Sequence, residues 1–449
     1  MDPIPQTDPT KMAEASVLDT MRVMNTVVAP TLAKGVIKRR PSVEALAQHR
    51  ALDTKAIELL QDLRHKYGNG PLYLRFPFRS QVLLLDPEHV AQVLAETPAP
   101  FTSATKEKVS ALEHLEPENV LISSPARRDE LRPVHEYALA TDKRVHPLAG
   151  HFKDIIRTEA ESLLPNAGQD GETTMDWDKF AQAWFKVVRR IVLGDAARED
   201  ESLSGDLSAI RGRGNWGFAA SANKSKLESF QKKLGQYLQN SEDGSLVSRL
   251  PKNSELDLES QVAHWLFAFD PAGMVTFRAL ALLGCQPEQQ KEAIKEADDI
   301  SAGEDHPFTR SVFLEAVRLW PTTPVILREL TEDSDIGGFT VEKGTGVIIF
   351  EPFFHRDSER LNFAHHMSPE NWARGDAVLG SGLVPFSAGP AMCPAHNLVP
   401  LVGSLMMDEL LSKATIDLVE PSLDPESLPG TLDHFEVKLR LSPRGVAVA

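Results

Sequence analysis

The feature of this 449-residue sequence that most constrains its fold is one long apolar segment beyond the middle of the chain. Residues 257–283 read DLESQVAHWLFAFDPAGMVTFRALALL, and from Val262 to Leu283 only four residues interrupt the apolar run: His264, Asp270, Thr276 and Arg278. A helix that is apolar on every face is buried in the middle of a large protein. At 1.5 Å per residue it would be about 40 Å long. The sequence therefore predicts a long central helix surrounded by other structure.

The remaining pattern is mostly helical, with few strands. Residues 1–40 look irregular, and residues 41–449 contain no composition shift that would mark a linker, so we expect an N-terminal arm followed by a single domain. The predicted helices are 42–67, 126–140, 142–164, 177–193, 223–239 and 257–283, together with a shorter helix that ends before Pro321 and a last one that begins after Cys393. Strands are expected within 71–87 and at 325–330 and 345–350. The fold class is mainly α with minor β, with small sheets at the periphery.

Charge and cysteine content exclude several classes of protein. The net charge of −16 argues against a nucleic-acid partner and against adhesion to anionic lipid. The start of the chain, MDPIPQTDPTKMAEAS, has no basic segment followed by an apolar core, so we expect no secretory signal. No transmembrane anchor is expected either. Two cysteines in such a long chain are not a disulfide framework, which favours a reducing compartment and a soluble, cytoplasmic protein.

The sequence FSAGPAMCPA, residues 386–395, is the strongest chemical signal. Gly389 allows the backbone to turn tightly. Cys393 is expected just before a helix, with Pro394 as the first helical residue. Free N–H groups at a helix N-terminus lower a thiol pKa and stabilise a thiolate ligand. The alternative is a buried structural cysteine, which is the ordinary state of a single free thiol.

Four segments, in order along the chain, resemble motifs of the cytochrome P-450 family. The cysteine loop of that family is Phe-x-x-Gly-x-basic-x-Cys-x-Gly, and its other motifs are Glu-x-x-Arg, Ala/Gly-Gly-x-acid-Thr and Pro-x-Arg-Phe/Trp. The matching residues are Phe386, Gly389 and Cys393; Glu315 and Arg318; Ala272, Gly273 and Thr276; and the segment SPENW, residues 368–372. The chain departs from the family at Val275, Asn371, Ala391 and Ala395. The resemblance runs from about residue 70 to the C-terminus.

The resemblance implies a cytochrome P-450 fold with the long helix over a haem b whose iron is bound by Cys393. It also implies that Phe386 shields the sulfur and that the Glu315–Arg318 pair holds the segment before the cysteine loop. Haem carries two propionates, and buried carboxylates need cationic partners. Ala391 cannot supply a cation, so the resemblance favours Arg328, with Arg128 and Arg132 as further candidates. A solvated helix face is the alternative for the last two.

For oxygen activation the resemblance points to Thr276. Its hydroxyl could reach the carbonyl of Ala272 one turn earlier, and the small residues Ala272 and Gly273 would leave room for dioxygen. Val275 replaces the carboxylate that commonly relays protons, and Asp270 could substitute for it. The alternative is that Asp270 only accepts local hydrogen bonds.

The function implied is monooxygenation: an oxidoreductase that hydroxylates or dealkylates a small-to-medium apolar substrate with O2. Electrons would come from a separate ferredoxin-type donor and its reductase, because no nucleotide-binding fingerprint is present. Substrate contacts are expected from residues 101–124, 205–222, 264–269 and 322–326, which include the aromatic residues Phe101, Trp216, Phe218 and Phe269.

Three alternatives remain open at this point. One is peroxide-using or rearranging haem-thiolate chemistry without a reductase, and another is a non-catalytic haem or ligand-binding protein. The last is zinc bound by Cys393 and His396, for which other histidines would have to be recruited without recognisable spacing.

Overall fold

The computed structural model describes most of the chain. The described residues are 12–76, 79–113, 115–165, 171–215, 223–252, 255–299, 305–373 and 380–444. The helices are α1 (Val17–Val23), α2 (Ala29–Lys34), α3 (Pro41–His49), α4 (Leu52–Tyr67), α5 (Pro87–Ala95), α6 (Lys106–Leu112), α7 (Pro125–Ala138), α8 (Ala149–Ala160), α9 (Trp177–Leu193), α10 (Glu201–Gly214), α11 (Lys224–Gln239), α12 (Leu258–Gly284), α13 (Pro287–Asp299), α14 (Pro307–Leu319), α15 (Glu351–His355), α16 (Glu370–Ala373) and α17 (Leu398–Leu411).

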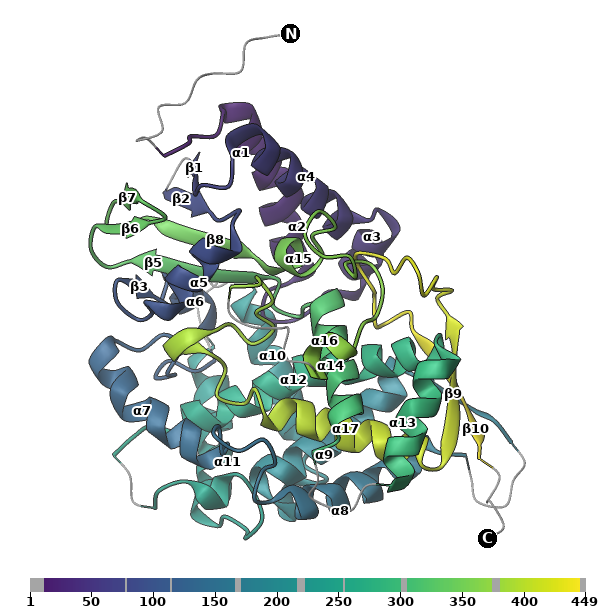
Figure 1. Ribbon diagram of the computed structural model, residues 1–449. Helices are drawn as coiled ribbons and strands as arrows, with labels where there is room; N and C mark the ends of the chain where they lie inside the picture. The colour runs from purple at the N-terminus through teal and green to yellow at the C-terminus, as the bar shows by residue number, and fades with distance from the viewer. Residues whose placement is uncertain are drawn as a thin grey trace.

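Three small sheets accompany the helices, as expected for a mainly α fold with minor β-structure. The largest has the strand order β1-β2-β8-β5-β3, with bounds Leu72–Arg75, Ser80–Leu83, Gly346–Phe350, Val325–Leu330 and Phe101–Thr102. The second is β4 (Thr173–Asp176), β10 (Lys438–Pro443) and β9 (Ala414–Glu420). The third pairs β6 (Ser334–Ile336) with β7 (Phe339–Val341). In Figure 1 the five-stranded sheet lies with α1–α4 at one end of the molecule, and the helical bundle forms the other end.

The predicted central helix is confirmed as α12, with bounds one residue from the expected ones. It packs against α9, α11, α13, α14 and α17, and most of its residues are buried. A helix surrounded in this way can be apolar on all faces. Among the described residues it is the one helix long and apolar enough to cross a membrane by length and composition, and most of its apolar length is buried inside the fold.

Several predicted boundaries are wrong. The helix expected at 42–67 is two helices, because Ala51 adopts a left-handed conformation (φ 49°) between α3 and α4. Residues 17–34, expected to be irregular, form α1, a π-helical turn and α2. The helix expected at 142–164 begins only at Ala149. Helix α10 has weak amphipathic patterning and was not predicted.

Candidate functional site

The loop that carries Cys393 is closed by its own backbone. The Cys393 N–H donates to the Phe386 carbonyl (2.9 Å), and the Met392 N–H donates to the Gly389 carbonyl (3.0 Å). Gly389 has a φ of 66°, and a Cβ there would lie 2.1 Å from the carbonyl oxygen of Leu94 on α5. The tight turn predicted at Gly389 is confirmed, and only glycine fits there.

The predicted surroundings of the thiol are wrong in two respects. Pro394 is not the first residue of a helix: residues 394–397 form turns, and α17 begins at Leu398. Burial raises the pKa of the Cys393 thiol, although the Ala395 N–H and Arg132 oppose this shift. A thiolate at this position therefore needs a further partner, such as a metal ion, to stabilise its charge.

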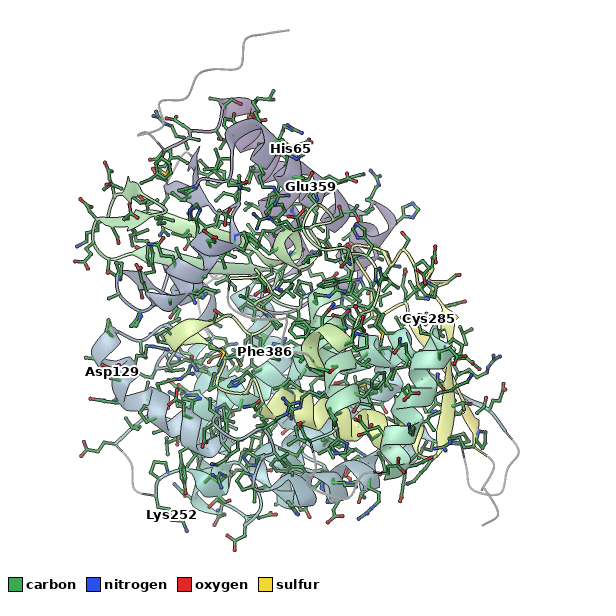
Figure 2. All side chains as sticks on the ribbon, in the orientation of Figure 1. His65, Asp129, Lys252, Cys285, Glu359 and Phe386 are labelled. Atoms are coloured by element: carbon green, nitrogen blue, oxygen red, sulfur yellow. The ribbon has the colours of Figure 1, made fainter. Side chains whose placement is uncertain are left out.

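The second cysteine is remote from this loop. Figure 2 shows Phe386 near the middle of the molecule and Cys285 towards its edge. Phe386 and Cys393 both pack against the helical core. The Cys285 thiol donates to the Leu282 carbonyl (3.3 Å), and burial raises its pKa to about 11. Of the two thiols, Cys393 is the one in a loop that backbone hydrogen bonds close.

The structure brings all three predicted cations to the cysteine loop. Arg128 Nη2 donates to the Pro390 carbonyl (2.7 Å), Arg132 Nη1 to the Met392 carbonyl (2.8 Å), and Arg328 Nη2 to Ser387 Oγ (3.2 Å). Arg132 also forms an ion pair with Glu136 (2.6 Å) on the surface of α7, so its charge is balanced. Arg128 and Arg328 are only 5% and 2% exposed, which rules out the solvated-face alternative for Arg128.

A further cation, Lys108 on α6, was missed by the sequence reasoning. Its Nζ lies 3.4 Å from the Leu327 carbonyl, next to Arg328. Burial, followed by repulsion from Arg328 and Arg128, lowers the pKa of Lys108 to about 7. Burial, followed by repulsion from Arg128, lowers the pKa of Arg328 to about 10. No sequence motif links the three cations: Arg128 follows Lys108 by 20 residues, and Arg328 follows Arg128 by 200 residues.

Lys108, Arg128 and Arg328 form what we call the cation cluster. Within the described residues, the hydrogen bonds of their charged groups go to backbone carbonyls and hydroxyls, and none goes to a carboxylate. Buried charges are normally paired. The cluster therefore fits a ligand with more than one negative charge beside Cys393. Haem, with an iron for the thiolate and two propionates for the cations, meets both requirements.

The residues predicted for oxygen activation lie on different faces of α12. Thr276 Oγ1 donates to the Ala272 carbonyl (2.9 Å), as expected. The Thr276 side chain is fully buried and lies against Gly403 of α17, where an added Cβ would be 3.0 Å from Thr276 Oγ1. The same Cβ would be 2.5 Å from Phe313 of α14. This close packing fills the space around the hydroxyl with protein atoms.

Asp270 does not merely accept local hydrogen bonds. Its Oδ2 lies 2.5 Å from Nη2 of Arg211 on α10, 59 residues earlier in the chain. Gly273 faces α9, where an added Cβ would lie 2.7 Å from the Trp184 ring. The glycine therefore allows α9 and α12 to pack closely, which is a structural reason for it that the sequence did not reveal.

The buried ion pair between Glu315 and Arg318 is confirmed. Arg318 Nη2 lies 2.7 Å from Glu315 Oε2, and neither side chain is exposed. Glu315 also accepts hydrogen bonds from the Ser368 N–H (2.7 Å) and from Trp372 Nε1 (2.6 Å). These partners belong to SPENW. The pair thus holds that segment through Ser368 and through Trp372, the residue that matches Phe/Trp of the family motif.

The aromatic residues expected to contact substrate lie in the core or outside the described residues. Phe101 and Phe269 are buried core residues, and Trp216 and Phe218 lie outside the described residues. In the described part of the chain no three His, Cys, Asp or Glu side chains are grouped as metal ligands. The zinc alternative therefore gains no third ligand there for Cys393 and His396.

Comparison with known proteins agrees with the motifs. The family profile named Cytochrome P450 matches residues 218–430. Cytochrome P-450 4V2 of Pongo abelii is 31% identical over 153 residues, which is 31% of this chain and 29% of the relative. Cytochrome P-450 4c21 of Blattella germanica is 30% identical over 174 residues, 36% of this chain and 34% of the relative.

A bacterial enzyme is also similar. Cyclooctat-9-en-7-ol 5-monooxygenase of Streptomyces melanosporofaciens is 30% identical over 142 residues, 29% of this chain and 31% of that enzyme. The chain matches about a third of the length of these curated relatives. The profile match, the cysteine loop and the buried Glu315–Arg318 pair together make the chain similar to the cytochrome P-450 family.

Proposed function

We propose that this chain is a haem-thiolate monooxygenase in which Cys393 binds the iron and the cation cluster binds the propionates. The observation that carries the proposal is that Arg128 and Arg328 bind the loop of Cys393, that Lys108 lies next to Arg328, and that none of the three bonds to a carboxylate within the described residues. Members of the family use haem with a cysteine thiolate ligand. When bound, such a haem supplies O–O bond cleavage, which the thiolate favours by pushing electron density towards the iron.

The chain's own residues would prepare the site. Phe386, whose carbonyl accepts the Cys393 N–H, would keep water from the sulfur. Arg128 and Arg132 fix the loop through the Pro390 and Met392 carbonyls. Asp270, held by Arg211, is our candidate for moving protons, because Asp270 lines a cavity whereas the Thr276 hydroxyl is buried against α17.

The finer features of the proposal come from the sequence. We propose an organic substrate, a separate ferredoxin-type electron donor with its reductase, and a cytoplasmic location.

A second candidate function is chemistry without electron input, either peroxide use or rearrangement. The buried position of the Thr276 hydroxyl favours this function, because a hydroxyl that bonds to the Ala272 carbonyl and lies against Gly403 is poorly placed to hold water near a reacting group.

Product formation by the purified haem-loaded protein distinguishes the two functions. A library of organic substrates would be incubated either with ferredoxin, reductase and NADPH under air, or with peroxide in the absence of reductase. Product that requires both O2 and the reductase supports monooxygenation. Product formed equally well with peroxide alone, or without any oxidant, would overturn monooxygenation in favour of the second function.

A further inference from the structure

A cavity with a volume of about 190 Å³ lies between α9, α10 and α12. Leu266, Asp270 and Met274 line it from α12, and their four-residue spacing places them on one face of that helix. Thr276, which contacts α17 near Gly403, lies on another face. The cavity is therefore distinct from the close contact between α12 and α17.

Most of the cavity wall is apolar. Besides Leu266 and Met274, the apolar lining residues are Trp177, Phe185, Val188, Leu203, Leu207 and Phe435. Such a wall binds an apolar body of a ligand, because burying apolar surface is favourable by roughly 25 cal/mol per Å².

The polar part of the wall is predominantly cationic. Lys38, Arg39, Arg189 and Arg211 line the cavity, and Asp270 is the one acidic residue in its lining. Arg211 is neutralised by Asp270, at 2.5 Å. The other three cations in the lining are Lys38, Arg39 and Arg189.

Arg39 is paired with Glu44 (3.3 Å), outside the lining. Arg189 is buried and donates to the carbonyls of Ala197 and Arg198 and to Ser204 Oγ, while acidic residues at the start of α10 act on it from beyond the wall. Lys38 is exposed, and its Nζ donates to Ser208 Oγ (2.6 Å). Within the described residues, no ion pair to a carboxylate is formed by Lys38. The mouth of the cavity thus has a free positive charge beside serine hydroxyls.

We propose that this cavity binds a monoanionic amphiphile, a molecule with one apolar body and one carboxylate or sulfonate group. The anionic group lies at the mouth with Lys38 and the hydroxyls of Ser204 and Ser208. The apolar body lies against the aromatic wall. This site goes beyond the proposed oxidation, because the ligand need not be the molecule that is oxidised. It also differs from the apolar substrate that the sequence suggested, because the ligand carries a negative charge.

Isothermal titration of the purified haem-loaded protein tests the site. The probes are 2-naphthoate and decanoate, each compared with its neutral methyl ester and with the corresponding primary amine. The anion of at least one set should bind at least fivefold more tightly than its ester, and the amine most weakly. The preference should diminish with added salt, because the Lys38 charge is exposed to screening.

Variants at the mouth assign the preference to Lys38. Lys38→Met should weaken binding of the anion about fivefold, in the range of one exposed charge pair, and leave the ester unchanged. Lys38→Glu should remove the preference for the anion. Arg50→Glu is the matched control, since Arg50 is also exposed but does not line the cavity. Both substitutions at position 38 are at the surface and should not affect folding.

Two results would overturn the proposal. One is equal binding of anion and ester in both probe sets, and the other is an anion preference that Lys38→Glu and Arg50→Glu reduce to the same extent. Because the readout is binding rather than turnover, neither result depends on whether the protein is a monooxygenase.

Discussion

Lys108 lies on α6 with its Nζ 3.4 Å from the Leu327 carbonyl, next to Arg328. The family's cysteine loop has a basic residue where this chain has Ala391, and the cation cluster places Lys108 beside Arg328 instead. We therefore expect Lys108 to replace the missing basic residue in holding a haem propionate.

Haem retention measures this replacement. Lys108→Met should speed haem transfer to apomyoglobin about tenfold, equivalent to one ion pair of about 1.4 kcal/mol. Adding Ala391→Arg to that variant should restore slow transfer. Lys106→Met, an exposed lysine on the same helix, is the control. Unchanged transfer in Lys108→Met would show that other residues hold the propionates.

The pKa of Lys108 also makes haem binding depend on pH. In the haem-free fold the pKa is lowered to about 7 by burial and by the two arginines. A bound dianion would raise it again, so haem binding above pH 7 takes up a proton. Haem affinity should therefore fall as pH rises from 7 to 9, and the slope should disappear in Lys108→Met. Titrations of the haem-free protein with haem across this range would measure both slopes, and an equal slope in the variant would contradict the assignment.

At the scale of elements, the Glu315–Arg318 pair joins α14 to the segment before the cysteine loop. Glu315→Ala leaves the Arg318 charge buried and unpaired, which typically costs about 3–5 kcal/mol. We expect strongly reduced thermal stability and low haem content. Trp372→Phe removes one hydrogen bond and should cost about 1 kcal/mol. Thermal unfolding should show that Glu315→Ala is less stable than Trp372→Phe. A Glu315→Ala protein as stable as wild type would contradict the buried-pair interpretation.

Helix α12 presents Asp270 and Thr276 to different surroundings, so substitutions there should have different effects. Asp270→Asn should lower the product formed per NADPH consumed at least threefold and raise peroxide release. Thr276→Val should preserve this coupling, because the Thr276 hydroxyl bonds only to its own helix in the described contacts. NADPH, product and peroxide would be assayed in parallel. If less product were formed per NADPH in Thr276→Val but not in Asp270→Asn, Thr276 rather than Asp270 would be the residue that moves protons.

The sequence predicted those elements whose signal is local. Helices α9 and α12 have sharp polar-to-apolar boundaries, and their predicted bounds are within one residue of the observed ones. The turn at Ala51 and the turns after Pro394 were missed, because the first breaks a continuous helical pattern and the second depends on the loop's tertiary contacts. Likewise, Cys393, Glu315 and Arg318 belong to motifs, whereas Lys108 comes next to Arg328 through a tertiary contact between its Nζ and the Leu327 carbonyl of β5.

At the scale of the whole molecule, helices α12 and α17 lie against each other in one core, and the five-stranded sheet with α4 forms a second core. The cation cluster draws on both regions: Arg128 comes from α7 among the helices and Arg328 from β5 in the sheet (Figure 1). A ligand bound by both would join the two regions of the fold.

The central claim is that Cys393 supplies the thiolate ligand to haem iron. The most direct measurement is the absorption spectrum of the reduced protein with carbon monoxide, recorded for wild type, Cys393→His and Cys285→Ser. We predict the red-shifted Soret band of a thiolate-ligated haem in wild type and Cys285→Ser, and its loss in Cys393→His. Retention of that band in Cys393→His, or its absence from haem-loaded wild type, would contradict the account.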